Sequence, residues 1–193
     1  MATKVEQTTK EKVKQTAQKL FREKGYAAVG MRELAKEVGI QAPSLYNHYK
    51  SKDDILREIC MDMAAQFFTA FDAAIATEQK AGRQLRAVIR AHIGVVAANM
   101  DSAEVFFQEW IFLEQPALGK FKKMRLEYET KFRGILDKGI RKKEIKKVNT
   151  KLATFAIFSA LNATYDFMRS TEKLSQEQMA DELADLLLKG LKT

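Results

Sequence analysis

The sequence predicts an all-α protein. Only two prolines, Pro43 and Pro116, interrupt its 193 residues, so turn signals lie too far apart for many short strands. Apolar residues recur at helical spacing, as at Val13, Ala17 and Leu20, and no stretch is a candidate strand. Hydrophobic residues make up 46% of the chain and charged residues 30%, which provides for a packed core and argues against wholesale disorder.

Capping residues and helix breakers divide the first part of the chain into five helices. Gly25 and Gly39 directly follow the first two, where a left-handed C-cap favours glycine. Ser51 is placed to cap the fourth, with Asp53 and Asp54 in its first turn, where the helix dipole favours carboxylates. In chain order these helices are expected over residues 7–24, 31–38, 42–49, 52–78 and 83–99, with Ala81-Gly82 separating the last two.

Four more helices follow. Pro116 lies in the first turn of the seventh helix, where proline is tolerated. Ser175 opens the ninth, and Glu177-Gln178 supply the acceptor side of a capping box. The sixth helix is expected over residues 101–114, and the seventh from Pro116 along a basic stretch, in which Gly134 or Gly139 allows a break. The eighth is expected from 149 or 150 to 170, and the ninth from Ser175 onward.

Positive charge is concentrated near the N-terminus. The formal net charge of the chain is +8. Residues 1–52 hold 11 Lys and Arg against 5 Asp and Glu, a net of +6, whereas the other 141 residues hold 22 against 20, a net of +2. Such a basic unit favours a nucleic-acid partner. We therefore expect a DNA-binding domain over residues 1–52 and a larger helical domain over 53–193, with the fourth helix connecting them.

Other classes of protein are disfavoured. Cys60 is the single cysteine, which excludes an internal disulfide and, with only His48 and His92 beside it, suggests no metal site. The polar start contains no signal peptide, and the most apolar run, residues 152–163, is too short to span a bilayer, so we expect a soluble cytoplasmic protein with no membrane partner. No nucleophile–base pair, paired-acid constellation or cofactor loop is present, so we expect no cofactor and no enzyme; a small helical lyase or hydrolase is the rival interpretation.

Residues 31–50 have the pattern of a helix-turn-helix. That motif needs a small residue where its helices cross, a glycine at the left-handed turn and an apolar residue on the second helix. Ala35, Gly39 and Leu45 occupy those positions, with apolar support from Leu34, Val38 and Ile40. Tyr49 is also expected in the core.

The flanks of this motif resemble the signature of the TetR family of transcriptional regulators. The most telling block is Leu45-Tyr46-Asn47-His48-Tyr49-Lys50-Ser51-Lys52, and the match runs from about Thr8 to Leu56. The resemblance implies a nine-helix architecture, with a three-helix helix-turn-helix domain followed by a ligand-binding and dimerisation domain. The sequence departs from the family at Val29-Gly30, where Ser or Thr usually caps the second helix, and at Gln41-Ala42.

The resemblance also implies a set of DNA contacts. Gln41 is suited to adenine in the major groove, and Ala42-Pro43 to a thymine methyl. Tyr46, His48 and Lys52 resemble the family's backbone clamps, although partial burial is the alternative for Tyr46. The expected contacts are Met31, Arg32, Gln41, Ala42, Pro43, Ser44, Tyr46, Asn47, His48 and Lys52.

The resemblance places an effector pocket among the C-terminal helices, where large apolar residues are frequent. Such pockets are mainly apolar with a few polar groups, whereas an ordinary core is the alternative for any single residue. Phe155 and Phe167 belong to this apolar set. The expected lining residues are Phe67, Phe68, Phe71, His92, Phe106, Trp110, Asn162 and Tyr165.

Two stretches, His92 to Glu114 and Ala160 to Tyr165, look similar to a TetR subgroup that responds to fatty acyl-CoA and related thioesters. Ala163 stands where that subgroup often has an aromatic residue. The basic run from Lys120 to Arg125 is a candidate for CoA phosphates, with a solvated helix face as the alternative. We therefore expect a repressor that a small apolar effector releases from a near-palindromic operator; an acyl-CoA is one candidate, and a drug or other lipophile is the other.

The family pairs its last two helices with their copies into a four-helix interface, which implies a homodimer. Small residues at helical spacing on the eighth helix allow the close approach of a second helix. The expected interface residues are Ala156, Ser159, Ala160, Ala163, Leu183, Leu187 and Gly190.

Overall fold

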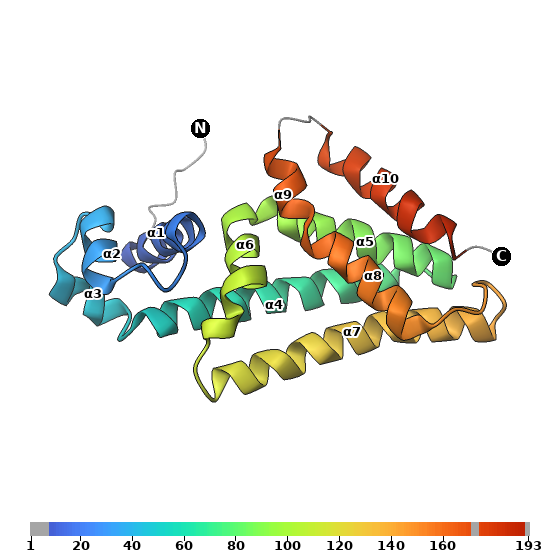
Figure 1. Ribbon diagram of the computed structural model, residues 1–193, viewed down its shortest axis with the longest axis horizontal. Helices are drawn as coiled ribbons and strands as arrows, with labels where there is room; N and C mark the ends of the chain where they lie inside the picture. The colour runs from blue at the N-terminus through green and yellow to red at the C-terminus, as the bar shows by residue number, and fades with distance from the viewer. Residues whose placement is uncertain (1–7, 171–173, 192–193) are drawn as a thin grey trace. The chain divides into compact units, whose positions relative to one another are not determined.

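The computed structural model describes residues 8–170 and 174–191, and every regular element in those ranges is a helix (Figure 1). The elements are α1 (Thr9–Lys24), α2 (Met31–Val38), α3 (Ala42–His48), α4 (Lys52–Ala76), α5 (Ala81–Ala98), α6 (Met100–Gln108), the 3-10 turn η1 (Glu109–Phe112), α7 (Ala117–Arg141), α8 (Thr150–Asn162), α9 (Thr164–Arg169) and α10 (Gln176–Lys189). The all-α prediction is confirmed.

The nine expected helices are all present in the described ranges, but two of them are divided. The sixth tightens at its end into η1, as helix termini often do. The eighth is interrupted at Ala163, which separates α8 from α9. There the buried hydroxyl of Thr164 donates to the carbonyl of Leu161 at 2.7 Å, and such side-chain bonds compete with the regular helical ladder.

Most of the predicted caps are observed, but Gly25 ends α1 with φ +80° and ψ +147°, outside the left-handed helical region. Gly39 has φ +80° and ψ +31°, the left-handed conformation that ends α2. Ser175 and Gln178 form the capping box of α10, and Thr8 and Glu11 form another at the start of α1. The expected start of the first helix, near Gln7, lies outside the described residues.

The break expected near Gly134 or Gly139 is absent, and α7 is continuous from Ala117 to Arg141. A glycine inside a helix costs only about 1 kcal/mol relative to alanine, which packing can offset. Gly139 is buried, and a Cβ placed on it would lie 2.7 Å from the Cβ of Ala81 and 2.5 Å from Cδ1 of Ile145. The glycine therefore serves a close approach of α7 to α5 and to the chain that follows α7.

The chain forms two compact units. Unit 1 comprises the residues up to Met63 together with Asp101–Phe121, and unit 2 comprises Ala64–Met100 and the residues from Lys122 onward. This division passes through α4 and α7, whereas a domain boundary at residue 52 stays a prediction.

Unit 1 is built on buried side chains from α1 to α4. α1 packs on α2 and α2 on α3. Lys14 on α1 binds Glu58 and Asp62 on α4 at 3.1 and 2.8 Å, and the Arg22 side chain lies 3.1 Å from Asp101 of α6. The buried residues of its helical core include Val13, Ala17, Leu20, Phe21, Leu34, Leu45, Tyr49, Ile55, Leu56 and Ile59.

Unit 2 has its own apolar core, to which α4, α5, α7, α8 and α10 contribute. α10 packs along α5 (Figure 1). Arg86 on α5 binds Asp185 on α10, and Nε of Arg90 donates to Asp181 at 2.6 Å. These pairs fix the register of α10 on α5.

α4 is long and apolar enough, by length and composition alone, to cross a membrane. Its apolar side chains already have a place in the fold. Ile55, Leu56 and Ile59 are buried in unit 1, and Phe67 and Phe71 are buried in unit 2. Core packing therefore accounts for part of the hydrophobicity of this helix, since 33% of its most apolar stretch is buried.

Candidate DNA-binding and effector sites

The helix-turn-helix has the geometry that its residues predict. Ala35 is 2% exposed and Leu45 is fully buried, so the two helices cross closely over a small apolar centre. Gly39 makes the left-handed turn between them. Tyr49 is buried, as expected, and desolvation raises the pKa of its phenol. The second helix of the motif, α3, is thus held by its inner face.

The outer face of α3 is polar and open to solvent. Gln41, its N-cap residue, is exposed and makes no side-chain capping hydrogen bond, so its amide remains available for a base edge. Pro43, Asn47 and His48 are exposed, and Tyr46 is 50% exposed, so this tyrosine is not a core residue. Ala42 and Ser44 are half-buried in the leading turn.

Four of the expected DNA contacts share one shallow hollow of about 630 Å³ in unit 1. Met31, Arg32, Tyr46 and Lys52 line it, and Lys50 adds a further cation. The hollow lies at the N-terminus of α2, where the N-cap residue Gly30 provides no side-chain hydrogen bond. A helix N-terminus with neighbouring cations suits a phosphate group.

Lys52 has a structural role that its sequence position does not reveal. Its ammonium donates to the carbonyls of Tyr26, Ala27 and Val29 at 2.9, 3.3 and 3.0 Å. It also lies 4.4 Å from the centre of the Tyr26 ring. These contacts join the first residue of α4 to the loop between α1 and α2, so a phosphate would compete with carbonyls for this ammonium.

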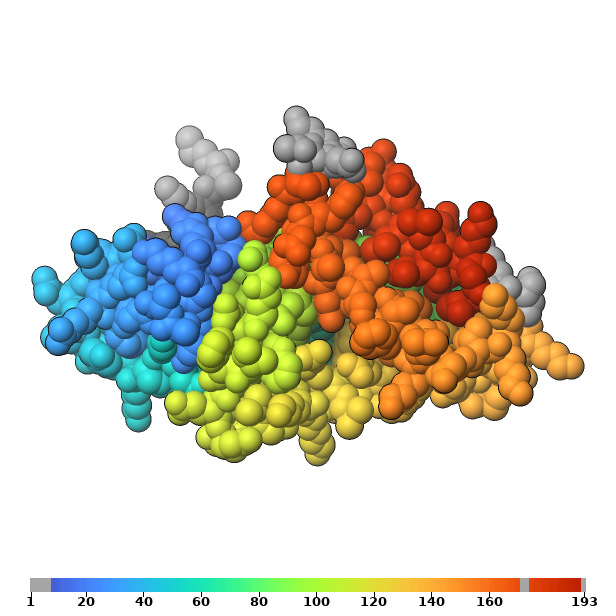
Figure 2. Space-filling model, viewed as in Figure 1, coloured from blue at the N-terminus to red at the C-terminus, as the bar shows by residue number. Residues whose placement is uncertain are grey.

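Unit 2 carries exposed apolar side chains on α8 and α10, and parts of both helices lie on the face of the molecule seen in Figure 2. On α8, Leu152 and Phe155 are 64% and 70% exposed, and on α10, Leu186 is 75% exposed. The expected interface residues Ala156, Ser159, Ala163 and Gly190 are exposed, whereas Ala160, Leu183 and Leu187 are half-buried. We call this set, with Leu152, Phe155 and Leu186, the α8/α10 face.

Several of the expected effector residues meet in an aromatic cluster within unit 2. His92 on α5 lies 4.5 Å from Phe67, and Tyr128 on α7 lies 5.5 and 5.2 Å from Phe68 and Phe71, measured between ring centres. Phe158 on α8 completes the aromatic cluster, at 5.5 Å from Tyr128. Burial lowers the pKa of His92 to about 3, so its imidazole is neutral at physiological pH.

The remaining expected effector residues lie apart from this cluster. Phe106 and Trp110 belong to unit 1, where their rings lie 5.2 and 5.7 Å from Phe121. Tyr165 is buried in α9, and Asn162 is half-buried at the end of α8. The sequence therefore grouped residues that the structure divides between two units.

Comparison with known proteins decides the family. Residues 15–59 match the model described as bacterial regulatory proteins of the tetR family. Residues 78–191, more than half of the chain, match the tetracyclin repressor-like C-terminal domain. The chain belongs to the TetR family. This family consists of ligand-responsive, DNA-binding transcriptional regulators rather than enzymes, and its members bind operator DNA as dimers.

Individual relatives extend over nearly the whole of this TetR-family chain. The fatty acid metabolism regulator protein of Bacillus subtilis (strain 168) is 25% identical over 177 residues, which cover 91% of both chains. The ketosteroid transcriptional regulator KstR2 of Mycobacterium tuberculosis superposes with a TM-score of 0.91 at 17% identity, covering 97% of both chains. AibR in complex with isovaleryl coenzyme A and operator DNA superposes with a TM-score of 0.82 at 18% identity, covering 93% of this chain and 97% of AibR.

Sequence reasoning about this TetR-family regulator missed several residues. Phe155 on α8 and Phe167 on α9, expected among the apolar core or pocket residues, are 70% and 38% exposed. α8 is apolar on more than one side, so its pattern does not identify the side on which Phe155 lies. Tyr128 was also overlooked. It lies four residues before the buried Phe132 on a helix that is otherwise highly charged, and this spacing was the available signal.

The buried His92 makes the stability of this TetR-family regulator depend on pH. Its folded-state pKa of about 3 lies below the ordinary value of about 6.5, so the unfolded chain binds the proton more readily. The contribution of His92 to the free energy of unfolding is therefore complete above about pH 6.5 and falls as the pH is lowered toward 3. Between pH 7 and pH 5 we expect a loss of about 2 kcal/mol from this residue.

Urea unfolding at pH 7 and pH 5 measures this effect. Between pH 7 and pH 5, the free energy of unfolding of His92→Leu should fall by about 2 kcal/mol less than that of the native chain. His48→Leu removes the exposed histidine and serves as the matched control. Its stability should depend on pH as that of the native chain does. Equal pH dependence in the native chain and His92→Leu would show that burial of His92 has no such effect.

Proposed function

We propose that the protein is a dimeric repressor that binds a near-palindromic operator and is released by a small apolar effector, with a long-chain acyl-CoA as the leading candidate. The observation that carries this proposal is the exposed polar face of α3, which is backed by a buried helix-turn-helix centre in the basic end of a TetR-family chain. The protein would act in the cytoplasm, with no membrane partner, no cofactor and no metal.

The proposed DNA contacts divide into two kinds. Arg32, Tyr46 and Lys50 surround the hollow at the start of α2 and would hold phosphates, which sets the register of the protein on the duplex. Gln41 and Asn47 would meet base edges from the exposed face of α3. Two copies of α3 would enter successive major grooves about 34–36 Å apart.

Dimerisation through the α8/α10 face would bring the two copies together. A large apolar surface on a soluble protein usually marks a binding interface. Small residues such as Ala156, Ser159 and Ala163 would allow the partner helix to approach closely, while Phe155 and Leu186 would supply buried area.

The effector proposal rests on the aromatic cluster and on the relatives. The aromatic cluster is apolar and its one imidazole is neutral, which suits the acyl part of a thioester or another lipophile. The relatives include a fatty acid metabolism regulator and a structure that contains isovaleryl coenzyme A. α4 carries Phe67 and Phe71 in this cluster and Lys52 at its start, so we propose that a shift of α4 moves the α1–α2 loop through Lys52 and weakens operator binding.

Titration of the protein–operator complex with acyl-CoAs, free fatty acids and lipophilic drugs tests this function. A promoter fragment next to the protein's own gene supplies the operator. We expect an acyl-CoA to weaken operator binding by about 1–3 kcal/mol, and operator DNA to weaken acyl-CoA binding by the same factor. Release by drugs alone would replace the CoA proposal while keeping the mechanism. A ligand that saturates the protein by calorimetry but leaves operator affinity unchanged would refute the route through α4.

Two substitutions should separate base reading from phosphate binding. Gln41→Ala should cost about 1–3 kcal/mol on the best operator and relax the preference at one base pair. Arg32→Ala, at an exposed position in the first turn of α2, should weaken all sequences alike and reduce the salt dependence by about one counterion. Binding assays on an operator library at several salt concentrations measure both. An unchanged base preference in Gln41→Ala would remove the reading role from that residue.

A further inference from the structure

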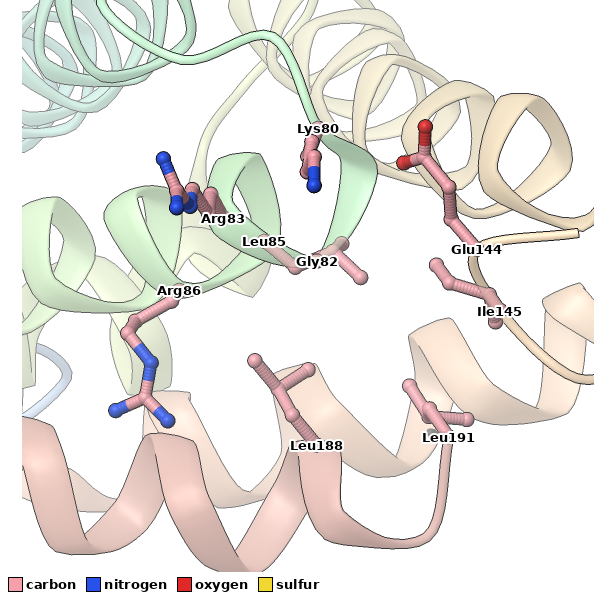
Figure 3. A pocket seen from close by; sticks show the side chains of 9 residues that line it. All are labelled: Lys80, Gly82, Arg83, Leu85, Arg86, Glu144, Ile145, Leu188 and Leu191. Atoms are coloured by element: carbon pink, nitrogen blue, oxygen red, sulfur yellow. The ribbon is translucent and has the colours of Figure 1, made fainter. Parts of the chain in front are cut away.

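A hollow of about 420 Å³ opens in unit 2 at the N-terminal end of α5 (Figure 3). Three segments enclose it: the start of α5, the residues that follow α7 and the C-terminal end of α10. None of its lining residues belongs to the aromatic cluster, and none is among the expected DNA, effector or dimer contacts. The lining residues are Lys80, Gly82, Arg83, Leu85, Arg86, Glu144, Ile145, Leu188 and Leu191.

The floor of this hollow is apolar. Leu85, Ile145 and Leu188 are buried members of the unit 2 core, and Leu191 is half-buried beside them. Figure 3 shows the side chains of Ile145, Leu188 and Leu191 directed into the open space. An aliphatic chain placed here would cover the edge of the core from water.

The rim is cationic. Lys80 and Arg83 are exposed on the α5 side, and within the described ranges neither forms an ion pair with an acidic side chain. Arg86 is paired with Asp185, so it contributes less charge to a ligand. Glu144 is the one carboxylate in the lining, and its Oε2 accepts the backbone N–H of Ala81 at 2.7 Å, which places its charge against the positive end of α5. The lining as a whole is therefore positive.

We propose that this hollow binds an aliphatic carboxylate. The head would lie between Lys80 and Arg83, where a guanidinium can hold a carboxylate by two parallel hydrogen bonds. The tail would lie over Leu85, Ile145 and Leu188. This site does not depend on operator binding or on the effector proposal, because its residues and its test are separate from both.

Octanoate is the probe. Octanol is the control that lacks the negative charge, and acetate is the control that lacks the long aliphatic chain. Binding is followed by calorimetry and by the methyl NMR signals of Ile145 and Leu188, with Ile93 as a buried reference elsewhere in the core. We expect saturable shifts of the Ile145 and Leu188 methyls with octanoate and much weaker ones with octanol and acetate. Absence of these shifts up to the solubility limit of octanoate, or equal shifts with octanol, would overturn the proposal.

The double variant K80Q/R83Q tests the cationic rim. Both side chains are exposed, so the fold should be retained, and circular dichroism checks this. We expect octanoate to bind this variant roughly tenfold more weakly, since a charge-assisted hydrogen bond is lost at each position. Lys151→Gln removes an exposed cation of the same unit outside the hollow and should leave the affinity unchanged. Unchanged affinity in K80Q/R83Q would likewise overturn the proposal.

Discussion

Leu186→Glu is expected to convert the dimer to a monomer and to weaken operator binding by at least about 100-fold, since tethering two half-site contacts raises affinity by about 10²–10⁴. Leu186 is 75% exposed on α10, and dimerisation would bury it. A carboxylate in that position would have to be desolvated without a counter-charge, which is strongly unfavourable. Phe155→Glu on α8, where the side chain is 70% exposed, should act in the same way.

Light scattering on a sizing column measures the mass of each variant, and a gel shift measures operator affinity. Leu126→Glu is the matched control, because Leu126 is a 61% exposed leucine on α7, outside the α8/α10 face. This control should remain dimeric and bind operator normally. If Leu186→Glu and Phe155→Glu both stay dimeric, the dimer uses another surface.

Lys52→Met is expected to lower the free energy of unfolding by about 2 kcal/mol, because hydrogen bonds from a charged group are worth roughly 1.5–3 kcal/mol. Methionine retains the length of the side chain but leaves the carbonyls of Tyr26, Ala27 and Val29 without the ammonium. The loop before α2 would lose its tie to α4, so operator affinity should fall as well.

Lys50→Met separates this structural role from charge alone. Lys50 is exposed two residues earlier and lines the same hollow at the start of α2. Both variants should weaken operator binding, but only Lys52→Met should be less stable in urea unfolding. Equal stability of the two variants would show that the carbonyl contacts of Lys52 contribute little and would restore its role as a simple phosphate clamp.

Local features of this protein were predictable from local sequence. Gly25 and Gly39 end the first two helices, Ser175 with Gln178 caps the last, and Ala35, Gly39 and Leu45 place the helix-turn-helix. Each of these depends on residues within a few positions of one another. Hydrogen bonds at helix ends and the left-handed turn are determined at that range.

Features that depend on distant parts of the chain were not predictable. Whether Gly139 breaks α7 depends on Ala81 and Ile145, which approach it closely only in the folded protein. The interruption at Ala163 involves a local hydrogen bond, from the Thr164 hydroxyl to the carbonyl of Leu161, but the burial of Thr164 depends on the packing of the folded protein. Neither outcome can be read from helix propensity, because packing can outweigh a preference of about 1 kcal/mol.

By itself the sequence determined the class of fold and the order of the helices, since helical periodicity and helix-ending residues mark each helix. The expected DNA contacts of α3 came from the resemblance to the TetR family. Only the tertiary structure decided how the aromatic residues are divided between the two units, with Phe67 beside His92 in unit 2 and Trp110 beside Phe121 in unit 1. It also decided that Phe155 faces solvent and that Lys52 binds carbonyls 23 to 26 residues away. Apolar and cationic side chains have many possible partners, and chain topology selects among them.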